Sequence, residues 1–156
     1  GQGLLAVDLY SDGSGKENFT VPAGGSENPT SPQTLYDGEH TFQMNGRAVF
    51  ETATTVLPEA IRKVLTRCEL SIEDVDMLIP HQPSINILKV TAEKLALPFD
   101  KVATNMDKYA NTAGASVAIL LDEVRRGGRL VDGSTVVLAA VGSGWTWGAG
   151  VMRWVE

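Results

Sequence analysis

The chain has little cysteine and no long apolar run, and both absences narrow its class. Cys68 is the only cysteine among the 156 residues, so an internal disulfide framework is impossible, which fits a reducing compartment and a cytoplasmic location. No apolar run approaches the ~20 residues that a membrane-spanning helix needs, and no signal-peptide pattern opens the sequence. We therefore expect no membrane partner.

Positive charge is also scarce. The chain has 13 Lys and Arg against 19 Asp and Glu, which gives a net charge of −6. The field of the whole molecule therefore argues against a nucleic-acid partner. No second His or Cys lies at ligand spacing from either histidine, so we expect no metal. Hydrophobic residues at 43% and charged residues at 21% are ordinary for a globular protein.

The length suits one domain or one half of a larger one. Residues 1–40 open with the apolar run Leu4–Val7, which is typical of a strand, and continue with much Gly, Ser, Pro, Asn and Asp. Loop chemistry over such a length is unusual inside a compact domain. The chain also starts at Gly1 rather than Met. We interpret residues 1–40 as a crossover or linker segment from a missing N-terminal half, and residues 41–156 as the C-terminal domain.

Apolar spacing predicts helices and strands in alternation after residue 41. Pro58 is expected to kink or break the first helix, and Thr112 to cap the last one. The predicted helices cover residues 49–65, 85–95 and 112–126, and the predicted strands cover 76–79, 102–104, 135–141 and 148–154. The run at 135–141 is apolar throughout, as expected at the centre of a sheet. This alternation argues for a layered α/β domain.

His81 lies between a predicted strand and a predicted helix. Functional side chains of α/β proteins usually project at such junctions, and Pro80 and Pro83 restrict the backbone on either side. The alternative is a hydrogen-bonded structural histidine, but the surrounding pattern favours function. His40, next to Glu39 in polar loop sequence, is expected to be solvated.

Asn111 lies among small residues, from Ala110 to Ser116. Small residues allow the backbone to approach a ligand closely, but the spacing alone fits a helix cap equally well. A neutral imidazole and a carboxamide can jointly donate hydrogen bonds to a carbonyl that is becoming an enolate or oxyanion.

Two further features have competing interpretations. Gly142, Ser143 and Gly144 could present backbone N–H groups to a developing negative charge, although in isolation a tight hairpin is favoured. The following Trp145 and Trp147 are typical of packing rather than of substrate contact. Cys68 has no catalytic base beside it in the sequence, so we interpret it as structural or idle.

The ordered motifs together resemble the C-terminal half of 3-oxoacyl-[acyl-carrier-protein] synthase III, in the thiolase-like superfamily. The motifs are residues 12–14, 28–29, 44–50, 80–82, 111–116 and 142–149. The resemblance covers nearly the whole chain, and the order and spacing of the motifs make it specific. It implies an α/β fold of the thiolase-like half-domain type, with helices packed on a mixed sheet.

The resemblance also implies an acyltransferase of the Cys–His–Asn type. Such an enzyme catalyses the decarboxylative Claisen condensation of an acyl thioester with a malonyl thioester, in fatty acid or related polyketide biosynthesis. His81 and Asn111 fall on the positions that bind the malonyl thioester, promote loss of CO₂ and stabilise the enolate. The oxyanion and substrate-binding positions fall on Gly46, Phe50, Gly142, Ser143 and Gly144.

The implied substrates are acyl-CoA and malonyl-ACP or malonyl-CoA, with no cofactor. The implied partners are acyl carrier protein or CoA thioesters, the N-terminal half of the same enzyme, and a second copy in a homodimer. Asn86 stands where the family often has an arginine that helps to dock the carrier protein, and Lys89 and Lys94 lie nearby as weak substitutes.

The nucleophilic cysteine of the family is absent from this chain, so we expect the chain alone to be incomplete and inactive. The departure at Asn86 leaves open a related acyltransferase of secondary metabolism. A non-catalytic partner subunit is the other alternative, but the presence of both His81 and Asn111 argues against it.

Overall fold

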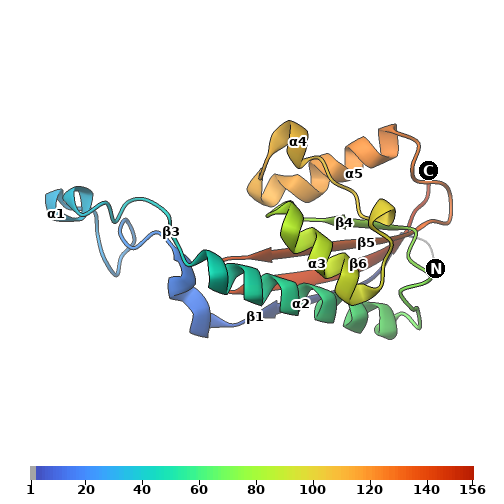
Figure 1. Ribbon diagram of the computed structural model, residues 1–156, viewed down its shortest axis with the longest axis horizontal. Helices are drawn as coiled ribbons and strands as arrows, with labels where there is room; N and C mark the ends of the chain where they lie inside the picture. Colours follow the sequence, from blue (N-terminus) through green and yellow to red (C-terminus); the bar gives the residue numbers. More distant parts are fainter. Residues whose placement is uncertain (1–2) are drawn as a thin grey trace.

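A computed structural model describes residues 3–156 and shows one main sheet between two layers of helices (Figure 1). The sheet has the strand order β1-β6-β5-β4. Its strands are β1 (Gly3–Ser11), β4 (Met77–Pro80), β5 (Thr135–Gly142) and β6 (Thr146–Arg153). β4 runs parallel to β5, whereas β6 is antiparallel to both β5 and β1. The mixed sheet with its helices confirms the predicted fold class.

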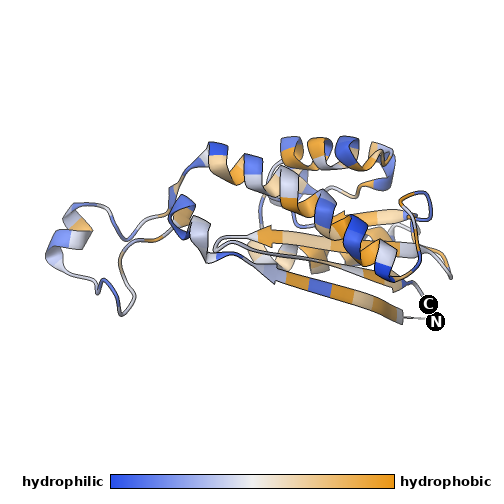
Figure 2. Cartoon of the chain, turned by 90° about the horizontal axis from the view of Figure 1, so that it is seen from below, coloured by the Kyte–Doolittle hydropathy of each residue, from blue (hydrophilic) through white to orange (hydrophobic). Residues whose placement is uncertain are grey.

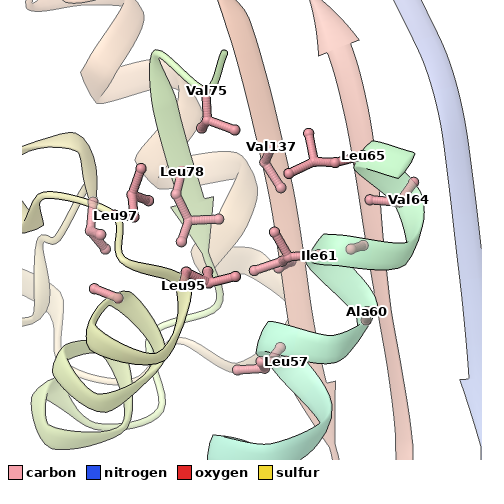
Figure 3. Packing of buried hydrophobic residues seen from close by; sticks show 14 of the residues in the cluster. Leu57, Ala60, Ile61, Val64, Leu65, Val75, Leu78, Leu95, Leu97 and Val137 are labelled. Atoms are coloured by element: carbon pink, nitrogen blue, oxygen red, sulfur yellow. The ribbon is translucent and has the colours of Figure 1, made fainter. Parts of the chain in front are cut away.

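Helices α2 (Gly46–Arg67) and α3 (Ile85–Leu95) cover one face of this sheet, which we call the covered face. Figure 3 shows α2 pointing Leu57, Ile61 and Leu65 toward the sheet and α3. These side chains form one buried cluster with Leu78 of β4 and Val137 of β5. Each such side chain stabilises the fold by roughly 1.5–3 kcal/mol when it leaves water. Along α2, hydrophobic and hydrophilic residues alternate as an amphipathic helix requires (Figure 2).

Helix α5 (Ser116–Arg126) covers only part of the opposite face. Its Leu120 and Val124 pack on Met77, Ile79 and Val136, which belong to β4 and β5.

The remainder of that face belongs mainly to β6 and β1. Val7 pairs with Gly150 and Leu9 pairs with Gly148, and paired residues point to the same side of a sheet. Leu9 is 80% exposed and Val7 41%. We call the surface formed by Val7, Leu9, Gly148 and Gly150 the open face.

The excursion, residues 12–45, projects from one end of the body (Figure 1). It contains η1 (Gly13–Asn18), α1 (Pro32–Tyr36) and a two-stranded ribbon of β2 (Phe19–Thr20) and β3 (Gln43–Met44). The first strand behaves differently, because β1 is paired with β6 along its length. Residues 3–11 therefore share the main sheet with the C-terminal part. The origin of residues 1–40 in a missing half stays a prediction.

The predicted break at Pro58 is wrong, because α2 continues through this residue and is 22 residues long in total. A proline has no N–H for the carbonyl four residues earlier, which here belongs to Thr54. The ammonium of Lys94, on α3, donates to this carbonyl at 2.9 Å. In return, Arg62 of α2 donates to the carbonyl of Lys94. Contacts between the two helices thus replace the bond that Pro58 cannot make.

Two smaller expectations also change. Thr112 makes no capping hydrogen bond; it precedes the short η3 (Ala113–Ala115), and α5 begins only at Ser116. The predicted strand at 102–104 is reduced to a single bridge between Val102 and Leu78. The remaining short helices are η2 (Phe99–Lys101) and α4 (Met106–Tyr109). Within residues 3–156, no helix is both long and apolar enough to cross a membrane.

Candidate functional site

A cavity of about 1150 Å³ lies over the open face. Its wall also includes the start of α2, the loop after β4, the segment before α5 and the turn between β5 and β6. Most of the residues predicted for the site line it. They are Gly46, Phe50, His81, Asn111, Gly142 and Ser143, whereas Gly144 does not line the cavity.

His81 is held at the end of β4, where its backbone N–H donates to the carbonyl of Ala139 at 2.7 Å. Its Nδ1 lies 2.7 Å from the hydroxyl of Ser116. Within residues 3–156, its Nε2 has no hydrogen-bond partner. Burial lowers the pKa of His81, and a hydrogen bond to the backbone of Ala113 offsets part of this effect. The imidazole is therefore neutral near pH 7.

Gln82 fixes the turn that carries His81. Its side chain is fully buried. The amide nitrogen donates to the carbonyls of Pro80 at 3.0 Å and Ala103 at 3.4 Å, and the amide oxygen accepts from the backbone of Asn105 at 3.2 Å. One carboxamide thus joins the turn after β4 to the segment that leads to Asn111. The motif at residues 80–82 includes Gln82 but does not show its role, since a glutamine beside a candidate residue gives no sign of burial.

Asn111 is exposed to the cavity, and the oxygen of its carboxamide already accepts a hydrogen bond. The side-chain oxygen accepts from the backbone N–H of Ala113 at 2.8 Å. Because a backbone N–H must donate, the atom facing it is the oxygen, and the NH₂ group is left as the donor. That NH₂ group has no hydrogen-bond partner in the part of the chain that the structure describes. Asn111 thus forms a local turn and still has a free donor at the cavity.

The segment before Asn111 is fixed through Glu123 of α5. Glu123 accepts from the side chains of Asn105 at 2.7 Å and Tyr109 at 3.2 Å, and it pairs with Lys108. The hydrogen bond from Asn105 is the largest cause of the lowered pKa of Glu123. This network connects α4 to α5, so Asn111 and Ser116 are held by the same helix.

The turn at residues 143–145 joins β5 to β6, which confirms the hairpin interpretation. Ser143 is exposed and lines the cavity. Trp145 is 6% exposed, and its indole lies against Gly15, where an added Cβ would be only 1.9 Å from Nε1. Trp147 stacks on Tyr10 with the ring centroids 5.6 Å apart. Packing is therefore the main role of both tryptophans, although both also line the cavity.

The start of α2 forms an apolar rim of the cavity. Asn45 caps this helix by accepting from the backbone N–H of Ala48 at 3.2 Å. Gly46 adds no side chain, and Phe50 is partly exposed. Phe42 and Met44, at the end of the excursion, extend the same rim.

The other candidates lie outside the cavity. Cys68 is half-buried at the C-terminal end of α2, where it packs against the covered-face core. Asn86, Lys89 and Lys94 lie on α3, and the ammonium of Lys94 donates to the backbone carbonyl of Thr54. His40 is exposed in the excursion. Residues 3–156 contain no cluster of His, Cys, Asp or Glu arranged to hold a metal ion.

Known proteins provide a family for this arrangement. The family model "3-Oxoacyl-[acyl-carrier-protein (ACP)] synthase III C terminal" matches residues 65–154. The beta-ketoacyl-[acyl-carrier-protein] synthase III of Caldanaerobacter subterraneus is 44% identical over 99% of this chain and 46% of its own length. The protein of that name from Clostridioides difficile is 40% identical over 97% of this chain and 46% of its own length.

Solved structures agree with the sequence relatives. The 3-oxoacyl-(acyl carrier protein) synthase III of Pseudomonas aeruginosa has a TM-score of 0.87 and 35% identity, over 98% of this chain and 46% of its own. The synthase III of Aquifex aeolicus has a TM-score of 0.85 and 33% identity, over 97% of this chain and 44% of its own. The chain thus spans less than half the length of the relatives it matches. These similarities confirm the predicted resemblance and the half-domain fold.

Proposed function

Because the chain belongs to the 3-oxoacyl-[acyl-carrier-protein] synthase III C-terminal family, we propose that it is the C-terminal catalytic half of a condensing enzyme of that type. The proposed reaction joins an acyl thioester to a malonyl thioester with loss of CO₂, as in fatty acid biosynthesis. The strongest support is the single cavity that receives His81, Asn111 and Ser143 from three separate loops.

In this proposal, His81 and Asn111 bind the thioester carbonyl of the malonyl group. When CO₂ leaves, the electron pair of the broken C–C bond moves toward this carbonyl, whose oxygen becomes negative. Donors that already point at this oxygen stabilise the enolate without rearrangement. His81 would donate through Nε2 and Asn111 through its NH₂ group, the two groups that lack other partners. A neutral histidine can fill this role when its proton is on Nε2, because that N–H then donates to the carbonyl oxygen.

The enolate carbon then attacks an acyl group held on a cysteine of the N-terminal half. A new C–C bond forms, and the cysteine leaves as a thiolate. We assign the backbone N–H of Ser143, between Gly142 and Gly144, to the oxyanion of this second step. Gly46 and Phe50 would line the passage for the arm of the thioester, since both lie on the apolar rim of the cavity.

The proposed partners follow from the same reaction. The N-terminal half would cover the open face, whose exposed Val7 and Leu9 gain from leaving water. The substrates would be acyl-CoA and malonyl-ACP or malonyl-CoA, with no cofactor, and the complete enzyme would be a homodimer. Carrier docking on α3 would depend on Asn86 and Lys89, because the ammonium of Lys94 is bound to Thr54.

The test uses the complete enzyme, with this chain and its N-terminal half together. Release of CO₂ from malonyl-CoA reports decarboxylation, and intact mass after reaction with acyl-CoA reports acylation of the cysteine. His81→Ala and Asn111→Ala should each lower decarboxylation by roughly 10²–10³-fold and leave acylation nearly intact. His40→Ala is the matched control and should change neither step. Equal loss of both steps in the His81 and Asn111 variants would contradict the assigned roles.

A second test uses this chain alone. After incubation with a panel of acyl-CoA donors, its mass should not increase, because the nucleophile lies elsewhere. A stoichiometric acyl adduct on Cys68 would contradict the proposed division of labour between the halves.

A further inference from the structure

The turn that carries Ser143 is tied to the base of the excursion. The last named pair of β1 and β6 is Ser11 with Thr146. Beyond this pair, the backbones of Asp12 and Trp145 bond to each other in both directions. The N–H of Asp12 donates to the carbonyl of Trp145 at 2.8 Å, and the N–H of Trp145 donates to the carbonyl of Asp12. The turn is therefore fixed to the residue after β1 as well as to β5 and β6.

The side chain of Trp145 provides a second contact with the excursion. Its indole is 6% exposed and lies against Gly15, which is buried within η1. A Cβ at position 15 would overlap Nε1 and Cδ1 of this indole, so the packing requires glycine there. A Cβ at Gly13, in the same short helix, would meet no residue of the described chain within 4 Å apart from its own neighbours. The close contact is thus specific to one position of η1.

The same short helix also holds the start of α2. The side chain of Asn18 donates to the carbonyl of Gly15 at 3.2 Å, and the backbone carbonyl of Asn18 accepts from the N–H of Asn45 at 2.8 Å. Asn45 is the residue that caps α2. One short helix therefore connects the turn that carries Ser143 to the apolar rim of the cavity at Gly46.

We infer that Gly15 and Trp145 are positioning residues for acyl transfer, because the indole packed on Gly15 fixes the place of the Ser143 N–H. The turn consists only of residues 143–145, between the paired ends of β5 and β6. So short a turn has no slack, and a displacement of Trp145 must be passed on to Ser143. A contact outside the turn thus sets the position of the donor within it.

The consequence for the reaction rests on the proposed function. When the cysteine takes the acyl group from acyl-CoA, its sulfur bonds to the acyl carbon, the acyl oxygen becomes negative, and CoA then leaves as its thiolate. The same oxygen becomes negative again when the enolate attacks. A misplaced Ser143 N–H therefore slows both steps. The loss of CO₂ uses other donors, those of His81 and Asn111, so it does not depend on this contact.

Gly15→Ala tests the contact in the complete enzyme, and Gly13→Ala is the matched control. Gly15→Ala should lower the rate of cysteine acylation by about tenfold or more, because a small misplacement of a catalytic donor has a large effect on rate. Release of CO₂ from malonyl-CoA, measured without an acyl donor, should stay nearly unchanged. This pattern is the reverse of the one expected for His81→Ala. Gly13→Ala should change neither step. Equal loss of both steps in Gly15→Ala, or an unchanged rate of acylation, would overturn the inference.

A double-mutant cycle examines whether the indole is the link. Trp145→Ala removes the side chain that an added Cβ would displace, and it should itself lower acylation, because the turn loses its anchor. In that background, Gly15→Ala should cause no further loss. Additive losses would mean that Gly15 acts by a route other than Trp145, which would also overturn the inference.

A measurement on this chain alone separates the inference from the proposed function. In a nitrogen-15 NMR spectrum, Gly15→Ala should shift the amide signal of Ser143 and the indole N–H signal of Trp145, and Gly13→Ala should shift neither. A Ser143 signal that stays in place in Gly15→Ala would overturn the inference. If the complete enzyme neither acylates nor decarboxylates, the proposed function fails, while the NMR result still decides the contact.

Asp12→Ala decides the question if Gly15→Ala prevents folding. The exposed carboxylate of Asp12 accepts from the N–H of Ser14 at 2.9 Å and caps η1. Loss of this cap loosens η1 without adding an atom to the core. Asp12→Ala should therefore shift the Ser143 amide signal and lower acylation, by less than the loss in Trp145→Ala. A folded Asp12→Ala protein in which both the signal and the rate of acylation are unchanged would overturn the inference.

Discussion

The two faces of the main sheet differ in how completely they are filled. On the covered face, α2 and α3 bury Leu57, Ile61 and Val64 to 2% exposure or less. On the open face, Leu9 is 80% exposed and lies across strand positions occupied by glycine. The same strands form both faces, so the difference arises from alternate residues along each strand.

The residues that stabilise the fold and the residues of the candidate site therefore lie mainly in different parts of the molecule. The covered face contains the larger of the two buried apolar clusters. Only the end of this cluster reaches the cavity, through residues such as Ala53, Ile87 and Val141. The open face leaves room for the cavity, and His81, Asn111 and Ser143 reach it from loops at its border. Substitutions on the covered face should therefore change the stability of this chain, whereas those on the open face should act mainly through the cavity or a missing partner.

The largest expected effect compares equivalent truncations on the two faces. Ile61→Ala removes a fully buried side chain and should lower the free energy of unfolding by about 2–5 kcal/mol. Leu9→Ala, on the open face, should change it by no more than about 0.5 kcal/mol. Urea unfolding of this chain followed by circular dichroism measures both. Similar losses for the two variants would show that the open face is buried in solution.

A second prediction adds an atom to the open face. At Gly148, a new Cβ would lie 2.7 Å from Leu9 and 2.8 Å from the backbone oxygen of Asp8. Gly148→Ala should therefore push β1 away and cost about 1–3 kcal/mol. Gly150→Ala is the control, because its nearest contacts are 3.3 Å from Val7 and 3.4 Å from Ala6. Thermal unfolding should rank Gly148→Ala as the more harmful change, and the opposite rank would contradict the role of the closer backbone contact.

A third prediction weakens the contact between the two helices of the covered face. Lys94→Met keeps the apolar stem but leaves the carbonyl of Thr54 without its donor, which should cost about 1 kcal/mol. Lys89→Met is the matched control on α3, since Lys89 makes no hydrogen bond or ion pair within residues 3–156. Adding Pro58→Ala should remove the penalty of Lys94→Met, because residue 58 then donates its own N–H to Thr54. Additive effects in this double-mutant cycle would disprove the coupling.

The smallest expected effect is the pH dependence from His81. Burial lowers its pKa in the folded chain below the ordinary value of 6.5. Between these two pKa values the unfolded chain binds more protons, so stability rises with pH. His81 therefore stabilises the fold fully above about pH 6.5, and this contribution is lost as the pH falls toward the folded pKa. Denaturant unfolding as a function of pH should show a weaker slope in His81→Gln than in the original chain, and an equal slope would contradict this contribution.

Much of the fold could be predicted from local patterns. The apolar run at 135–141 became the inner strand β5, and the spacing from Val49 to Leu65 became α2. Pro58 was misjudged because its effect on a helix depends on a donor from another helix, Lys94. The capping role assigned to Thr112 is absent, and Asn111 instead bonds the backbone of Ala113.

The candidate site was harder to predict than the fold. The motifs named His81 and Asn111, and the structure brings both to one cavity, while their catalytic roles stay predictions. The motifs also include Gln82 and Ser116, but nothing in the sequence showed that their buried hydrogen bonds hold the site. The role of an ordinary polar side chain depends on the residues that it contacts in the folded chain. Gln82 contacts Ala103, 21 positions away, and Ser116 contacts His81, 35 positions away.

Hydrophobic periodicity and motif spacing are local properties of the chain, so they were enough to predict the main helices and strands and the family. Packing between distant segments was needed to show that β1 joins the main sheet, that α2 tolerates Pro58 and that one face stays open. It also decided which atoms surround His81. These features depend on contacts between distant residues, and the geometry of such contacts is fixed only when the helices and strands have packed together.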